Sequence, residues 1–89
     1  MVTRGKVLFI DDEIHIRQAN KQTLELADFE VLCEDCAENG LRVVNREWPG
    51  IVVCDIRLPN MDGLEFLSQV NMLDPDLPVI LITGHGDIS

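Results

Sequence analysis

Residues 7–13 read VLFIDDE, four apolar side chains followed directly by three carboxylates. Two further apolar runs of similar length occur at 51–54 and at 79–82, and a shorter apolar pattern surrounds Val31 and Cys33. Short apolar runs that are bounded by breakers are typical of buried strands. The pattern around VLFIDDE therefore predicts a strand that stops at its acidic residues, and three more strands further along the chain.

Longer amphipathic stretches separate these strands. Residues 13–27 are expected to form a first helix, and apolar positions at helical spacing between 37 and 44 indicate a second, although Gly40 weakens it. Asp62 with Glu65 three residues later resembles a capping box, which predicts the start of a third helix. The expected order is therefore β-α-β-α-β-α-β.

This order predicts the fold class. Strands that are apolar throughout are buried on both faces, which favours a parallel sheet covered by helices. Right-handed crossovers then give a doubly wound α/β sheet. With 89 residues and no linker or repeat, the chain is expected to hold one domain, residues 1–89.

Composition excludes several classes of function. The net charge is −9, from 16 acidic and 7 basic residues, which argues against direct contact with nucleic acid because phosphate binding requires clustered Lys and Arg. No apolar stretch approaches the ~18 residues of a membrane span, and no signal-peptide pattern is present. We therefore expect a cytoplasmic protein without membrane contact.

The three cysteines, Cys33, Cys36 and Cys54, do not form an even disulfide framework. The spacing of Cys33 and Cys36 is that of a redox CxxC motif, but such a motif normally opens a helix, whereas Cys33 lies in a strand pattern. Zinc would need about four ligands, and only His15 and His85 could supplement the thiols. Packed, structural cysteines are the expected outcome.

Polar residues follow three of the four predicted strands. Asp11 and Asp12 follow the first, Asp55 follows the third, and Thr83 follows the fourth. In an open parallel sheet, ligands bind at the carboxyl ends of the strands, near the point where the strand order reverses. The sequence therefore predicts three carboxylates and a hydroxyl around one pocket.

Gathering three carboxylates requires compensation. Two such charges ~4 Å apart repel by about 1 kcal/mol in water and by about 4 kcal/mol at an effective dielectric constant of 20. A hard divalent cation with oxygen ligands fits this set best, and Mg²⁺ is expected. Two simpler readings remain open, in which Asp11 or Asp12 caps the next helix and Asp55 begins a turn before Pro59.

Three segments together resemble a known family. They are VLFIDDE at 7–13, VVCDIRLPNMDGLEFL at 52–67 and PVILITGHGD at 78–87. Their motifs and spacing are similar to those of response-regulator receiver domains of bacterial two-component systems, which have a flavodoxin-like (CheY-like) fold. The third segment looks most like the receivers of enhancer-binding transcription activators, such as dicarboxylate-transport regulators.

The resemblance implies a signalling domain rather than an enzyme. Asp55 would accept a phosphoryl group from a sensor histidine kinase. Asp12 would bind Mg²⁺ directly and Asp11 largely through water, with Asp55 and the backbone carbonyl of Arg57 completing the protein ligands. Thr83 would contact the phosphoryl oxygens. Besides the kinase, a second copy of the chain, in a homodimer, is a possible partner that the resemblance leaves open.

The chain also departs from the family. Receivers carry a lysine after a fifth strand, whereas Lys6 and Lys21 are the only lysines here and the sequence stops at Ser89. The fifth strand and its flanking helices are missing, so we expect a fragment, with natural truncation as the alternative. A pseudo-receiver, which binds proteins without phosphotransfer, is the alternative function. Asp28 stands where receivers often have a glycine in the left-handed conformation.

Overall fold

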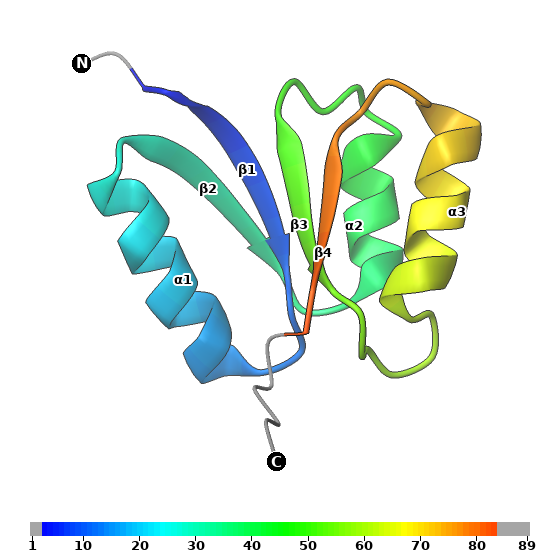
Figure 1. Ribbon diagram of the computed structural model, residues 1–89, viewed down its shortest axis with the longest axis horizontal. Helices are drawn as coiled ribbons and strands as arrows, with labels where there is room; N and C mark the ends of the chain where they lie inside the picture. Colours follow the sequence, from blue (N-terminus) through cyan, green and yellow to red (C-terminus); the bar gives the residue numbers. More distant parts are fainter. Residues whose placement is uncertain (1–2, 84–89) are drawn as a thin grey trace.

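The computed structural model of the chain describes residues 3–83, and residues 84–89, with the end of the third family-like segment, lie outside the described part. The alternation of strands and helices predicted from the sequence is confirmed (Figure 1). The elements are β1 (Gly5–Ile10), α1 (Ile14–Leu26), β2 (Phe29–Glu34), α2 (Ala37–Val44), β3 (Ile51–Asp55), α3 (Gly63–Leu73) and β4 (Val79–Ile82).

The four strands form one parallel sheet in the order β2-β1-β3-β4. The chain therefore moves outward from β1 to β2, returns past β1 to β3, and continues to β4. This reversal on either side of β1 is the doubly wound arrangement that the sequence predicted. It makes β1 and β3 neighbours, so that Val7 pairs with Ile51 although Ile51 lies 44 positions further along the chain.

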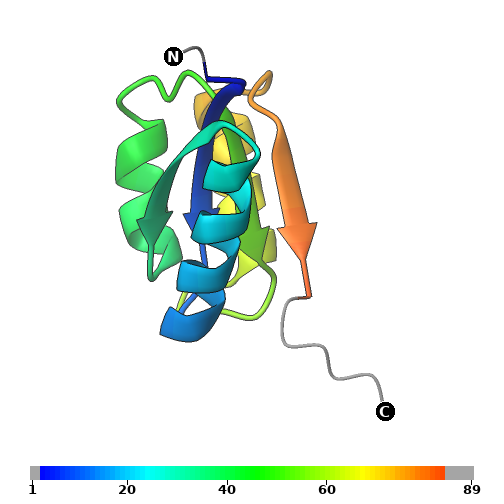
Figure 2. The ribbon, with the colours of Figure 1, turned by 90° about the vertical axis from the view of Figure 1, so that its left-hand side faces the viewer.

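The helices cover both faces of the sheet. α1 packs mainly against β2, whereas α2 and α3 pack together and against the strands from the other side. Figures 1 and 2 show this division, with α1 beside β2 and with α2 and α3 together at the other side of the molecule. Within the described residues the sheet therefore has one helix on one face and two on the other.

The main core lies under α2 and α3. Leu8 and Ile10 of β1 alternate with side chains of the other face, and they join Val52 of β3 and Phe66 and Val70 of α3 in one buried cluster. Burying apolar surface in this way supplies most of the stabilisation of a small domain. The central strands are thereby held rigidly, and with them the residues at their carboxyl ends.

The start of α3 is fixed by local contacts. The Asp62 carboxylate accepts a hydrogen bond from the Glu65 amide at 2.9 Å, as the capping pattern predicted. Gly63 follows, and its amide donates to the Ile56 carbonyl at 2.8 Å. A Cβ atom at Gly63 would lie 2.6 Å from the Asp55 carbonyl oxygen, so only glycine permits α3 to start this close to β3.

The turn between α1 and β2 shows how Asp28 is tolerated. Its φ is 71°, the left-handed conformation in which glycine is most favourable. Aspartate adopts this conformation more readily than most residues, because its short side chain can bond locally. The expectation that Asp28 stands at a left-handed helix cap is confirmed.

The three helices are short. α1, α2 and α3 have 13, 8 and 11 residues. Because crossing a bilayer takes about 20 consecutive apolar residues, none of the helices in residues 3–83 could span a membrane.

Candidate metal centre

Three carboxylates meet where β1 and β3 end. Asp11 and Asp12 directly follow β1, and Asp55 is the last residue of β3. The pairing of Ile10 with Cys54 sets the next residues, Asp11 and Asp55, side by side. One carboxylate oxygen from each of the three residues lies within 4.8 Å of the others. The strand order thus produces the convergence that the sequence predicted.

Two of these carboxylates are fully buried. Asp11 and Asp55 have 0% of their surface exposed, whereas Asp12 is open to solvent. A buried carboxylate is destabilising unless hydrogen bonds or an opposite charge compensate it. The three oxygens form a hard donor set open to water on one side, and this suits a small divalent cation such as Mg²⁺.

Each buried carboxylate is held by a backbone amide two residues further on. Asp11 Oδ1 accepts from the Glu13 amide at 2.9 Å, and Asp55 Oδ1 accepts from the Arg57 amide at 3.1 Å. The turn expected at Asp55 under the simpler reading is therefore present, and it coexists with the cluster. These bonds fix the orientation of both carboxylates.

The simpler reading of the first acidic pair is wrong. The N-cap of α1 is Glu13, whose side chain accepts from the His15 amide at 3.1 Å. Glutamate is seldom chosen for this position, and so the sequence pointed to its aspartate neighbours instead. Since Glu13 caps the helix, Asp11 and Asp12 lie before it, in the segment that joins β1 to α1.

Arg17 is a contributor that the sequence did not reveal. Its guanidinium Nη1 donates to the backbone carbonyl of Asp11 at 2.8 Å. The bond links the first turn of α1 to the end of β1, and it brings a positive charge to the acidic loop. The only signal in the sequence is an arginine near the start of the predicted helix, and arginine is also common at exposed helix positions.

Thr83 and Arg57 lie at the same edge of the sheet. Ile82, the last residue of β4, pairs with Asp55, and its carbonyl accepts from the Ile56 amide at 2.9 Å. Thr83 follows directly and is exposed. The backbone of Arg57 is held beside the Asp55 carboxylate by its amide, while its side chain is exposed.

Cys54 borders the acidic cluster without joining it. It is fully buried, and its pKa is raised to about 12, first by burial and then by the charges of Asp55, Asp11 and Asp62. A thiol that keeps its proton is a poor metal ligand and a poor nucleophile. All three cysteines are free thiols, and among the described residues the acidic trio is the one group of His, Cys, Asp and Glu side chains close enough to hold a metal ion.

Comparison with known proteins identifies a family. Residues 7–89 match the family described as the response regulator receiver domain. The chain is 53% identical over 83 residues to the C4-dicarboxylate transport transcriptional regulatory protein DctD of Pseudomonas aeruginosa, covering 93% of this chain and 18% of that protein. It thus spans less than a fifth of the length of this relative. The narrower resemblance to dicarboxylate-transport regulators is confirmed.

Solved structures agree. Full-length FixJ from B. japonicum superimposes with a TM-score of 0.86 at 33% identity, over 98% of this chain and 43% of that one. The response regulator protein TrrA from Thermotoga maritima, determined in complex with Mg(2+)-BeF, gives a TM-score of 0.83 at 27% identity, over 86% of this chain and 67% of that one. The fold expected for the family is confirmed.

Proposed function

The chain belongs to the response regulator receiver family of two-component systems, and on that premise we propose that Asp55 accepts a phosphoryl group with Mg²⁺ bound at the acidic cluster. The donor is a phosphohistidine on a sensor histidine kinase. The observation that carries this proposal is the meeting of Asp11, Asp12 and Asp55 within 4.8 Å at the ends of two adjacent strands.

The electrostatics of the cluster favour a bound cation. Carboxylates ~4 Å apart repel by about 4 kcal/mol at an effective dielectric constant of 20, and two of the three are removed from water. Asp11, Asp12, Asp55 and the backbone carbonyl of Arg57 are the groups we assign to the ion. When bound, Mg²⁺ would offset this repulsion and neutralise charge on the phosphoryl oxygens.

The chain's own residues position the reaction. An Asp55 carboxylate oxygen attacks phosphorus, the P–N bond to the histidine breaks, and its electron pair leaves with the imidazole, which takes up a proton. The product is an aspartyl phosphate. Since the Arg57 amide holds Asp55 Oδ1, the carboxylate is already oriented before the donor arrives, which is the main requirement of phosphoryl transfer.

Thr83 is assigned to the product state. Its place after β4, next to the end of β3, allows its hydroxyl to donate to a phosphoryl oxygen on Asp55. The phosphoryl group adds about −1.5 to −2 charges at neutral pH, and a neighbouring hydroxyl can respond to them by hydrogen bonding. In this proposal the phosphoryl group on Asp55 is a signal, and the chain does not act as an enzyme that turns over a substrate.

Phosphorylation of the intact protein by acetyl phosphate tests the proposal. With Mg²⁺ present we expect an acid-labile phosphate by mass spectrometry, and we expect its loss on adding EDTA. Asp55→Asn should abolish the label, because the amide is not a nucleophile of comparable strength. Asp76→Asn, an exposed aspartate beyond α3, is the matched control and should label normally.

Two outcomes would contradict the assignment. Undiminished labelling of Asp55→Asn would place the acceptor elsewhere. Failure of the unaltered protein to take up either phosphate or Mg²⁺, the latter measured by calorimetry, would leave the acidic cluster without the proposed chemistry.

A further inference from the structure

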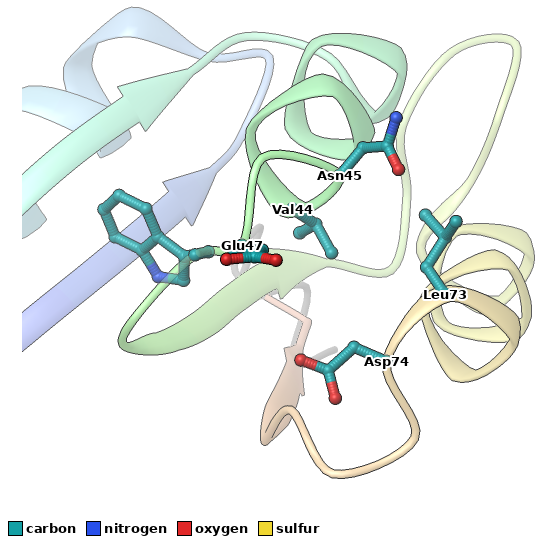
Figure 3. Close-up of a pocket in the computed structure, with 6 residues that line it drawn as sticks. Val44, Asn45, Glu47, Leu73 and Asp74 are labelled. Carbon is teal, nitrogen blue, oxygen red and sulfur yellow. The ribbon is translucent and has the colours of Figure 1, made fainter.

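A cavity lies between the ends of α2 and α3. Its volume is about 500 Å³, within the range of sites that enclose a ligand or several side chains. Its lining residues are Val44, Asn45, Glu47, Trp48, Leu73 and Asp74. Because each helix runs back from the carboxyl edge of the sheet, this cavity lies at the edge opposite the acidic cluster (Figures 1 and 3).

The walls of the cavity are mixed, with three apolar and three polar side chains. Val44 ends α2 and Leu73 ends α3, and Figure 3 shows them on two sides of the hollow. Trp48 adds its ring, and its one polar atom is satisfied within the chain, since Nε1 donates to the Ile51 carbonyl at 3.0 Å. The ring therefore has no hydrogen bond to offer a ligand, and it provides an apolar surface that can also receive a cation on its face.

The charged residues that line the cavity are both acidic, and Arg46, which stands between Asn45 and Glu47, is exposed and does not line it. Glu47 and Asp74 contribute two carboxylates, and each of the two helix C-termini carries a partial negative charge of about half a unit. The last turn of α3 contains no basic residue. In α2 the last-turn residue Arg42 bonds to Asn39 at 3.0 Å and does not line the cavity.

Glu47 adopts a backbone conformation that is unfavourable for residues other than glycine. Its φ is 62°, the left-handed conformation, and its amide donates to the Val44 carbonyl at 3.0 Å to end α2. Glycine is the usual residue at such a helix end, and a residue with a Cβ loses roughly 1–2 kcal/mol there. Within residues 3–83, the Glu47 side chain accepts no hydrogen bond and forms no ion pair.

We propose that this cavity binds an Arg or Lys side chain, with an adjacent apolar residue, from a segment of a partner protein. Such side chains combine an aliphatic stem with a charged head, which matches a lining of three apolar side chains and two carboxylates. Leu73 and Met72 are 50% and 79% exposed, so apolar surface continues onto the last turn of α3. A free amine would leave that surface in water, whereas a peptide segment would cover it. The proposal is independent of phosphoryl transfer.

A peptide titration of the intact protein tests the proposal. The probe is an acetylated, amidated peptide with the sequence Ala-Leu-Arg-Leu-Ala, and the reporter is the indole N–H resonance of Trp48, identified by its loss in Trp48→Phe. We expect a saturable shift. In the double variant Glu47→Gln with Asp74→Asn, affinity should fall at least tenfold, since both charges that face the guanidinium are removed.

The matched control is Glu25→Gln with Glu65→Gln, which changes the net charge equally at exposed positions outside the cavity. It should bind within twofold of the unaltered protein. Equal weakening in both double variants, no saturable shift, or equal binding by spermidine alone would overturn the proposal. Thermal unfolding of each variant checks that the fold is retained.

Discussion

The two faces of the sheet are stabilised differently. Under α2 and α3, Phe66 and Val70 are fully buried against β1 and β3. On the other face, α1 has no buried residue at all, and Ile80 of β4 is half exposed. Val7 and Phe9 are nevertheless buried, since they lie on the central strand. The two faces therefore differ in how completely helices cover them, and not in how apolar their strands are.

This difference shows where stability and interaction are expected. The face under α2 and α3 holds the acidic strand ends in place through a packed core, so changes there should unfold the domain. The face that carries α1 leaves apolar side chains of β4 at the surface, so changes there should alter association more than folding.

The largest expected effect is on the face under α2 and α3. Phe66→Ala removes a fully buried ring from the main cluster and should lower the free energy of unfolding by about 3–5 kcal/mol, as measured by urea denaturation. Leu26→Ala on α1, where the side chain is 79% exposed, should change it by less than about 0.5 kcal/mol. Similar losses for both variants would remove the distinction between the faces.

The second effect concerns β4, the last strand in the order of the described sheet. An edge strand with apolar side chains favours pairing with another chain, so the 89-residue chain should self-associate or precipitate. Ile80→Lys should shift sedimentation towards monomer, because a charge on an edge strand opposes pairing. Leu64→Lys, at a similarly exposed site on α3, should not. A monodisperse monomer of the unaltered chain would contradict this prediction.

The smallest effects concern two of the three cysteines, Cys33 and Cys54, which lie on opposite faces of the sheet. Cys33 is half-buried against α1, and burial raises its pKa while Lys21 and Arg17 partly offset the rise. Cys54 is fully buried on the other face, with its pKa raised to about 12. Because Cys33 is partly exposed, Ellman's reagent at pH 8 should modify it in the folded protein faster than Cys54, which should react only as fast as the domain opens.

The same shift at Cys54 makes stability depend on pH. The folded thiol holds its proton more tightly than the unfolded thiol, whose pKa is near 9. Its contribution is complete below pH 9 and is lost as the pH rises towards 12, with a loss on the order of 1 kcal/mol by pH 10. Urea denaturation at pH 8 and pH 10 should show a smaller decline for Cys54→Val than for the unaltered protein.

Much of the architecture was predictable from the sequence. The strands appear in the sequence as short apolar runs. The acidic residues at their ends meet because parallel strands end at a common edge of the sheet. The N-cap at Glu13 was not predictable, since capping depends on how the loop leaves β1. The cavity near Trp48 was not predictable either, because it forms where the ends of α2 and α3 come together. The periodicity within each helix does not tell how far apart the two helix ends lie.

The close approach at Gly63 has a mechanical consequence. α3 begins against the backbone of Asp55 and Ile56 and ends at Leu73, so its 11 residues form a rod about 16 Å long. Because Gly63 has no side chain, the backbone of α3 lies directly against the backbone of Asp55 and Ile56. A displacement at the end of β3 should therefore move the start of α3. Because the helix is rigid, its other end at Leu73 should move as well, on the opposite side of the domain.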